Sequence, residues 1–220
     1  MALTLEWRRR IDNFQKTLQG LIYRPLGEIE FRGFTTFDQL SAKEAQRRSF
    51  RPMPAGTEWG AKWEYAWFLG EVTLPAEASG ERIVLRLDLG GEALVWVNGV
   101  IVGSRDYAHT EVPLTLKGVA GTRYVIQAEA YAGHGKITVG GEPVPFGVET
   151  VPEPGVTQTQ VGVSTYGVWE EPLYQLNLDM TTLLELRDNL DPLSLRVAEI
   201  DRGLMDFTLI TDLELPRDEM

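Results

Sequence analysis

The sequence predicts a mostly β fold, an antiparallel β-sandwich with flanking α-helices. Residues 82–89 alternate between a leucine- and isoleucine-lined face and a charged face, and such a period of two is typical of a half-buried strand. Asn98-Gly99 stands between two apolar runs and is a strong signal for a hairpin with a type I′ turn. About eight such short strands, separated by glycine and proline, favour a sandwich over a parallel sheet.

Helices are expected at both ends of the chain. Residues 5–21 place Trp7, Ile11 and Leu18 at helical intervals, with basic residues between them. Residues 179–190 and 194–213 show similar spacing, and Asp179 is a plausible N-cap for the first of them.

The strands are expected between these helices, and Pro113 suggests that its strand lies at a sheet edge. In residues 173–178, Leu173, Gln175 and Asn177 alternate with Tyr174, Leu176 and Leu178, which we interpret as a last strand. The expected organisation has three parts: an N-terminal helix in 1–27, a β-sandwich domain in 28–178 and a helical connector in 179–220.

Composition limits the possible partners and compartments. The 220 residues carry a formal net charge of −11, which disfavours binding to nucleic acid and to anionic membrane surfaces. The chain has no cysteine, its N-terminus lacks the apolar core of a signal peptide, and no run is long enough to span a membrane. We therefore expect a cytoplasmic protein with neither nucleic-acid nor membrane partners.

No catalytic group and no metal site can be assigned from the sequence. The only two histidines, His109 and His134, lack a second histidine at ligand spacing, and the spacing of Asp106 and His109 is too common to indicate a metal. Acids such as Glu92 and Glu111 could serve a glycosidase, but the sequence pairs none of them. We expect no catalytic residues, no metal and no cofactor in this chain.

Candidate contact residues for a carbohydrate or a neighbouring domain can still be named. The loop after the central hairpin offers a cation, an acid, an aromatic ring and an imidazole, and Trp96 faces opposite to its two valine neighbours. An indole can stack on a sugar or fill a core, and Arg105 and Asp106 can instead pair with each other or with another domain. The candidates are Trp96, Arg105, Asp106, Tyr107, His109 and Trp169.

A family resemblance rests on the central sequence ERIVLRLDLGGEALVWVNGVIVG. It is similar to the sugar-binding-type sandwich modules ahead of glycosidase catalytic domains, including those of the galactosidase and glucuronidase family. The successive pieces WEYAWF, EVTLP, GEALVW, DYAH, EVPL and LLEL make the match more specific. In this order they resemble the N-terminal domain of α-mannosidases of glycoside hydrolase family 38, of the cytosolic/vacuolar and bacterial type, from about Trp63 to the C-terminus.

The resemblance implies a jelly-roll, galactose-binding-domain-like sandwich that does no chemistry itself. In that family a catalytic domain with zinc follows, and its motif begins with a histidine-x-histidine-x-aspartate run. No such run occurs here, so no catalytic or zinc residue is carried over, and the chain is expected to be incomplete and inactive alone.

The implied partners are its own catalytic domain, further copies in a homo-oligomer, and mannose-containing glycans. Two alternatives stay open. One is a carbohydrate-binding module of another glycosidase, such as the sugar-binding domain of a β-galactosidase-like enzyme. The other is an assembly element whose end helices pack on a partner.

Overall fold

A computed structural model describes residues 3–134, 138–139, 142–143 and 157–213. The chain forms two compact units, residues 25–168 and residues 1–24 together with 169–220. The elements in chain order are α1 (Leu5–Leu21), β1 (Tyr23–Glu28), β2 (Phe31–Thr36), α2 (Ala42–Ala45), β3 (Arg51–Pro52), β4 (Glu58–Trp59), β5 (Tyr65–Thr73), the 3₁₀ turn η1 (Ala76–Ala78), β6 (Ile83–Arg86), β7 (Glu92–Val97), β8 (Val100–Arg105), β9 (Glu111–Thr115), β10 (Arg123–Tyr131), β11 (Thr138–Val139), β12 (Glu142–Pro143), β13 (Thr159–Gln160), β14 (Thr165–Trp169), α3 (Glu171–Asn189) and α4 (Leu195–Ile210).

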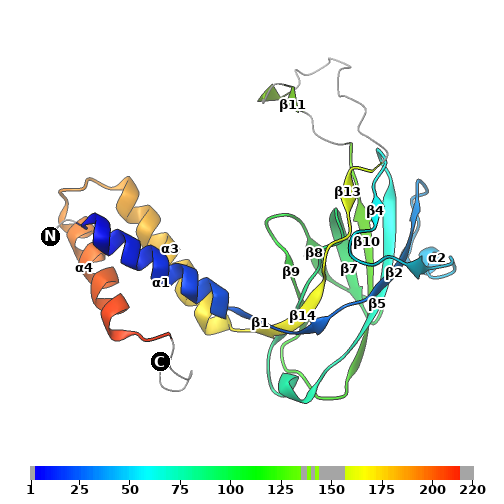
Figure 1. The fold of residues 1–220 in the computed structure, drawn as a ribbon, viewed down its shortest axis with the longest axis horizontal. Coiled ribbons are helices and arrows are strands. Elements are labelled where there is room, and N and C mark those ends of the chain that lie inside the picture. Colours follow the sequence, from blue (N-terminus) through cyan, green and yellow to red (C-terminus); the bar gives the residue numbers. More distant parts are fainter. Residues whose placement is uncertain (1–2, 135–137, 140–141, 144–156, 214–220) are drawn as a thin grey trace. The chain divides into compact units, whose positions relative to one another are not determined.

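The sandwich is built from two antiparallel sheets, which Figure 1 shows as the strand-rich part of the ribbon. A four-stranded sheet has the order β1-β14-β6-β9, and a six-stranded sheet has the order β3-β2-β5-β10-β7-β8. The predicted β-sandwich with flanking helices is confirmed. Strand β9 lies at the edge of its sheet, so the edge position predicted from Pro113 is confirmed as well.

The sandwich core consists of side chains from alternate strand positions. Leu85 of β6 and Ala128 of β10 are fully buried in it, as the period-two pattern requires. Phe68 of β5 is also fully buried and meets the rings of Phe31 and Trp59 edge-on, with centroid distances of 5.9 and 6.2 Å. These contacts fix which face of β5 points outward.

The hairpin between β7 and β8 turns at Asn98-Gly99, as predicted. Asn98 has φ 50° and Gly99 has φ 81°, and a type I′ turn requires positive φ at both positions. The Asn98 backbone N–H donates to the carbonyl oxygen of Val125 at 2.8 Å, and Asn98 Oδ1 accepts from the Val125 N–H at 2.9 Å. The turn is thereby tied to β10.

Replacing Gly99 with valine should destabilise the sandwich by about 1–3 kcal/mol, because a β-branched residue is strained at positive φ. A Cβ at Gly99 would meet nothing within 4 Å, so the backbone alone is tested. The measurement is urea unfolding of the 220-residue chain. The matched control is Gly203→Ala in α4, where a Cβ also meets nothing within 4 Å but the backbone is helical. The control should be neutral or stabilising, and equal effects would contradict the strain.

The second unit contains the helices α1, α3 and α4 (Figure 1). The predicted helix 5–21 is confirmed, and Thr4 caps it by accepting from the Trp7 N–H. Ile11 and Leu18 of α1 pack with Met180 and Leu184 of α3 and with Leu204 of α4. The unit therefore has a small apolar core of its own.

The strand predicted in residues 173–178 is wrong, because these residues form the first turns of α3. Pro172 stands at the start of this helix, where a missing N–H is tolerated. Asp179 consequently lies inside α3 and is not its N-cap. The helix predicted for residues 194–213 is confirmed in position, with Ser194 as N-cap, and ends at Ile210.

Candidate functional site

The outward face of the six-stranded sheet carries an ordered set of polar and aromatic side chains. Strand pairing places residues of β5, β10 and β7 side by side. Three rows follow on this face, in the strand order β5-β10-β7: Tyr65, Tyr131 and Glu92; Trp67, Glu129 and Leu94; Leu69, Gln127 and Trp96.

A hollow of about 300 Å³ lies over the first two rows. The Tyr65 and Tyr131 rings stack beside it, with centroids 4.8 Å apart. Burial raises the pKa of the Glu129 carboxyl above its ordinary value. The lining residues are Tyr65, Glu92, Ala93, Leu94, Ser104, Arg105, Asp106, Glu129 and Tyr131.

Trp63 extends the aromatic row. Its ring stacks with Tyr131 at 6.4 Å and meets the His134 ring edge-on at 5.3 Å. Trp63 has φ 65°, which is uncommon for a bulky residue, and its N–H donates to the carbonyl oxygen of Gly133 at 2.8 Å. The side chain is nevertheless 48% exposed. A constrained backbone thus displays an accessible indole.

The sequence-predicted loop 104–109 forms one rim of the hollow. Asp106 Oδ1 accepts from the N–H groups of Ala108 at 2.8 Å and His109 at 2.6 Å, and it lies 3.0 Å from His109 Nδ1. These bonds, led by the one to the His109 side chain, lower the pKa of Asp106. The oxygen that makes them is engaged in closing its own loop.

Arg105 is 5% exposed, which is unusual for an arginine. Its Nη1 donates to the carbonyl oxygen of Gly91, and its guanidinium carbon lies 5.9 Å from the Tyr107 ring centroid. Its buried Nε has no hydrogen-bond partner in the described part of the chain. Among the described residues it forms no ion pair. Tyr107 and His109 are exposed.

Trp96 and Trp169 lie elsewhere. Trp96 belongs to the third row, and its ring stacks on the fully buried Trp67 with centroids 5.6 Å apart. Trp169 belongs to the helical unit, where its Nε1 donates to Glu171 at 2.9 Å and its ring lies 5.0 Å from that of Tyr174. Of the six predicted contact residues, only Arg105 and Asp106 line the hollow. A contact role for any of them stays a prediction.

The sequence did not single out Tyr65, Tyr131 or Glu129, and it named Glu92 only as one of several unpaired acids. Alternation does place Tyr65 and Trp67 on one strand face. Their meeting with Tyr131 and Glu92 depends on pairing among three strands, and no local pattern carries that information.

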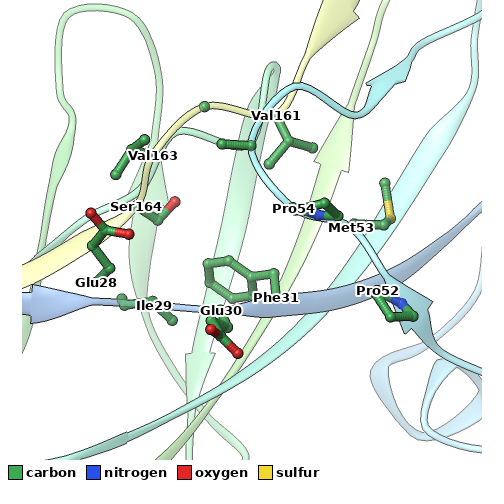
Figure 2. Close-up of a pocket in the computed structure, with 12 residues that line it drawn as sticks. Glu28, Ile29, Glu30, Phe31, Pro52, Met53, Pro54, Val161, Val163 and Ser164 are labelled. Atoms are coloured by element: carbon green, nitrogen blue, oxygen red, sulfur yellow. The ribbon is translucent and has the colours of Figure 1, made fainter.

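A second hollow, of about 430 Å³, lies where the chain passes from β1 to β2 (Figure 2). In Figure 2 the Phe31 ring lies between Ile29 and the Met53–Pro54 side, and Glu28 lies near Ser164. Phe31 is almost fully buried, so no aromatic face is open to a ligand there. This hollow contains none of the predicted contact residues.

The bond from His109 should hold the Asp106 pKa below its ordinary value. Because the pKa of Asp106 is lower in the folded state, its carboxylate stabilises the fold at pH values above the unfolded-state pKa of ~3.9. This stabilisation is lost as the pH falls through the folded-state pKa. A carboxyl NMR titration measures the midpoint. His109→Ala should move it upward, since the largest cause is removed, and an unchanged midpoint would contradict the assignment.

Two further searches concern only the described residues. They contain no group of three or more His, Cys, Asp or Glu side chains arranged to hold a metal ion, so the zinc of the resembled family has no fitting site among them. None of the described helices is long and apolar enough to cross a membrane.

The two antiparallel sheets define the class of the domain, a β-sandwich. Residues 26–168 match the family described as "Alpha-mannosidase, jelly roll domain". The chain therefore belongs to the alpha-mannosidase jelly roll domain family, and the resemblance to the N-terminal domain of family 38 α-mannosidases is confirmed.

Two curated relatives match part of the chain. Alpha-mannosidase 2C1 of Homo sapiens is 38% identical over 107 residues, and Alpha-mannosidase 2C1 of Mus musculus is 25% identical over 103 residues. Each match covers 42% of this chain and 10% of the relative. The match thus spans about a tenth of the relatives' length.

The chain is also similar at a low level to two solved structures. A β-glucuronidase from Ruminococcus gnavus in complex with uronic deoxynojirimycin has a TM-score of 0.45 and 13% identity, covering 68% of this chain and 29% of that one. The Faecalibacterium prausnitzii β-glucuronidase has a TM-score of 0.39 and 19% identity, covering 67% and 31%.

Proposed function

We propose that this chain is the non-catalytic N-terminal part of an α-mannosidase that hydrolyses α-mannosides in carbohydrate metabolism. Its role is to pack against the catalytic domain and to help assemble the oligomer. The observation that carries the proposal is the family match over residues 26–168, supported by the curated relatives. The match favours an α-mannosidase over the β-galactosidase-like alternative. The cytoplasmic location and the zinc in the catalytic domain belong to the same proposal.

The packing role is supported by apolar surface on the helical unit. Leu183 and Leu186 of α3 are exposed although α3 also has a buried side, lined by Met180 and Leu184. Leu193 and Leu195 add to the exposed apolar surface near the start of α4. Clustered exposed leucines are typical of protein interfaces.

The experiment is made in the full-length enzyme. Leu183→Glu combined with Leu186→Glu should weaken subunit or domain association, because each change places a charge in an apolar contact. The matched control is Thr182→Glu, an exposed neighbour on the same helix. Sedimentation velocity reports assembly, and circular dichroism of the 220-residue variants reports folding.

The expected result, in the leucine variant alone, is a smaller sedimentation coefficient or a lower melting temperature of the catalytic domain. A folded leucine variant with an unchanged sedimentation coefficient and an unchanged melting temperature of the catalytic domain would contradict a packing role for this surface. Equal effects of the leucine variant and the control would contradict it as well.

A further inference from the structure

We propose that the hollow over Tyr65, Tyr131, Glu92 and Glu129 binds one neutral pyranose ring of a glycan. The site lies on the outward face of the six-stranded sheet and is distinct from the exposed tip of the 104–109 loop. It goes beyond the packing role and does not depend on it.

The aromatic wall comes from the first row. Tyr131 is the middle member, with Tyr65 on one neighbouring strand and Glu92 on the other. The Tyr65 and Trp63 rings both stack with the Tyr131 ring, and Tyr65 and Tyr131 line the hollow. Where these rings meet the hollow they offer an apolar surface to a sugar ring, and the phenol hydroxyls remain available for hydrogen bonds.

The polar groups match the hydroxyls of a sugar. The carboxylate oxygens of Glu92 and Glu129 accept hydrogen bonds, and a sugar hydroxyl donates. Arg105 supplies the opposite function, because it lines the hollow and its Nε donor has no hydrogen-bond partner among the described residues. A buried donor without a partner is unusual in a folded protein. A hydroxyl or ring oxygen would satisfy it.

Size and charge narrow the ligand class. A volume of about 300 Å³ is at the small end for ligand pockets and suits one ring. Among the described lining residues, Glu92, Glu129 and Asp106 are acidic and Arg105 alone is basic, so the lining carries more acidic than basic groups. Anionic sugars such as uronates are therefore disfavoured, and neutral pyranoses are favoured.

Trp63 provides the adjoining stacking surface. Its indole follows Tyr131 in the ring stack, is nearly half exposed and is set there by a backbone conformation that tryptophan rarely adopts. A second ring of an oligosaccharide would meet it next to the hollow. Longer glycans should therefore bind more tightly than single sugars.

The test titrates the 220-residue chain with methyl α-D-mannopyranoside, its gluco and galacto counterparts, glucuronate and spermidine, followed by amide NMR shifts. The variants are Glu92→Gln, which keeps the shape, and Trp63→Asn, which tolerates positive φ. The control is Leu116→Ala, an exposed apolar residue outside the lining. Circular dichroism establishes that each variant is folded.

The expected result is saturable, millimolar binding of a neutral pyranoside, with shifts at Tyr65, Glu92 and Glu129. Affinity should fall about tenfold in Glu92→Gln, as for the loss of one charge-assisted hydrogen bond, and stay unchanged in Leu116→Ala. Trp63→Asn should weaken a disaccharide more than a monosaccharide.

Several outcomes would overturn the proposal. These are flat titrations for all neutral sugars, equally tight binding of glucuronate, binding of spermidine alone, loss of binding only in Leu116→Ala, and shifts confined to the second hollow of Figure 2. Binding of a glucoside or galactoside without the mannoside would also support the site, because the proposal names only a neutral pyranose. The site and the packing role are tested by different variants, so the two proposals can fail separately.

Discussion

Replacing Phe68 with alanine should destabilise the sandwich by about 3–5 kcal/mol, the usual loss when a buried phenylalanine is truncated. Phe68 is fully buried between the sheets and makes edge-on contacts with Phe31 and Trp59. The change removes buried apolar area, leaves a cavity that the rigid strands can fill only in part, and breaks both ring contacts. Urea unfolding followed by tryptophan fluorescence measures the difference.

The matched control is Phe37→Ala, since Phe37 is 66% exposed. It should change the free energy of unfolding by less than about 0.5 kcal/mol, as is usual for surface positions. A loss of less than about 1 kcal/mol in Phe68→Ala would contradict the close packing of this core.

Replacing Arg187 with alanine should destabilise the helical unit by about 3 kcal/mol, at the lower end for breaking a buried ion pair because Arg187 is partly exposed. Its partner Asp201 is only 1% exposed and accepts from Arg187 Nε at 2.9 Å and from the Leu3 N–H at 3.1 Å. Without Arg187, a carboxylate stays buried without its cation. Far-UV circular dichroism during urea unfolding reports this unit, because its residues are mainly helical.

The double variant Arg187→Met with Asp201→Leu separates the charge from the packing. It should recover most of the lost stability, because replacing both members of a buried pair by apolar residues is often neutral. Arg196→Ala is the control, since its contact with Glu199 spans 3.9 Å between exposed side chains. A double variant no more stable than Arg187→Ala would contradict the role assigned to the pair.

Local chemistry explains which parts of the fold could be predicted. The Asn98-Gly99 hairpin depends on two adjacent residues that accept positive φ, so its signal lies within a few positions. The helix at 5–21 has one apolar stripe that faces Met180 and Leu184, and its period is unambiguous.

The start of α3 was misinterpreted for a physical reason. This helix has a buried side with Leu173 and Leu176 and an exposed side with Leu178, so its apolar residues are not confined to one stripe. Over six residues such a pattern imitates strand alternation. The packing of α3 against α1 and α4 decides the outcome, and no local signal reports that packing.

The candidate site shows the same difference between features with a local sequence signal and features that depend on long-range contacts. Arg105 and Asp106 were found because several functional groups are adjacent in the sequence. The row of Tyr65, Tyr131 and Glu92 was not found, because its members come from three strands and meet only through their register. The burial of Arg105, with Nε unpaired, is likewise a property of the folded chain.

The central claim is that the chain is a non-catalytic jelly-roll domain of an α-mannosidase, and hydrolysis of a chromogenic α-mannoside tests it most directly. The comparison is between the purified 220-residue chain and the full-length enzyme, each with added zinc. The account predicts no turnover above background by the chain and clear turnover by the full-length enzyme. Turnover by the chain alone, abolished by a point substitution in the chain itself, would contradict the claim.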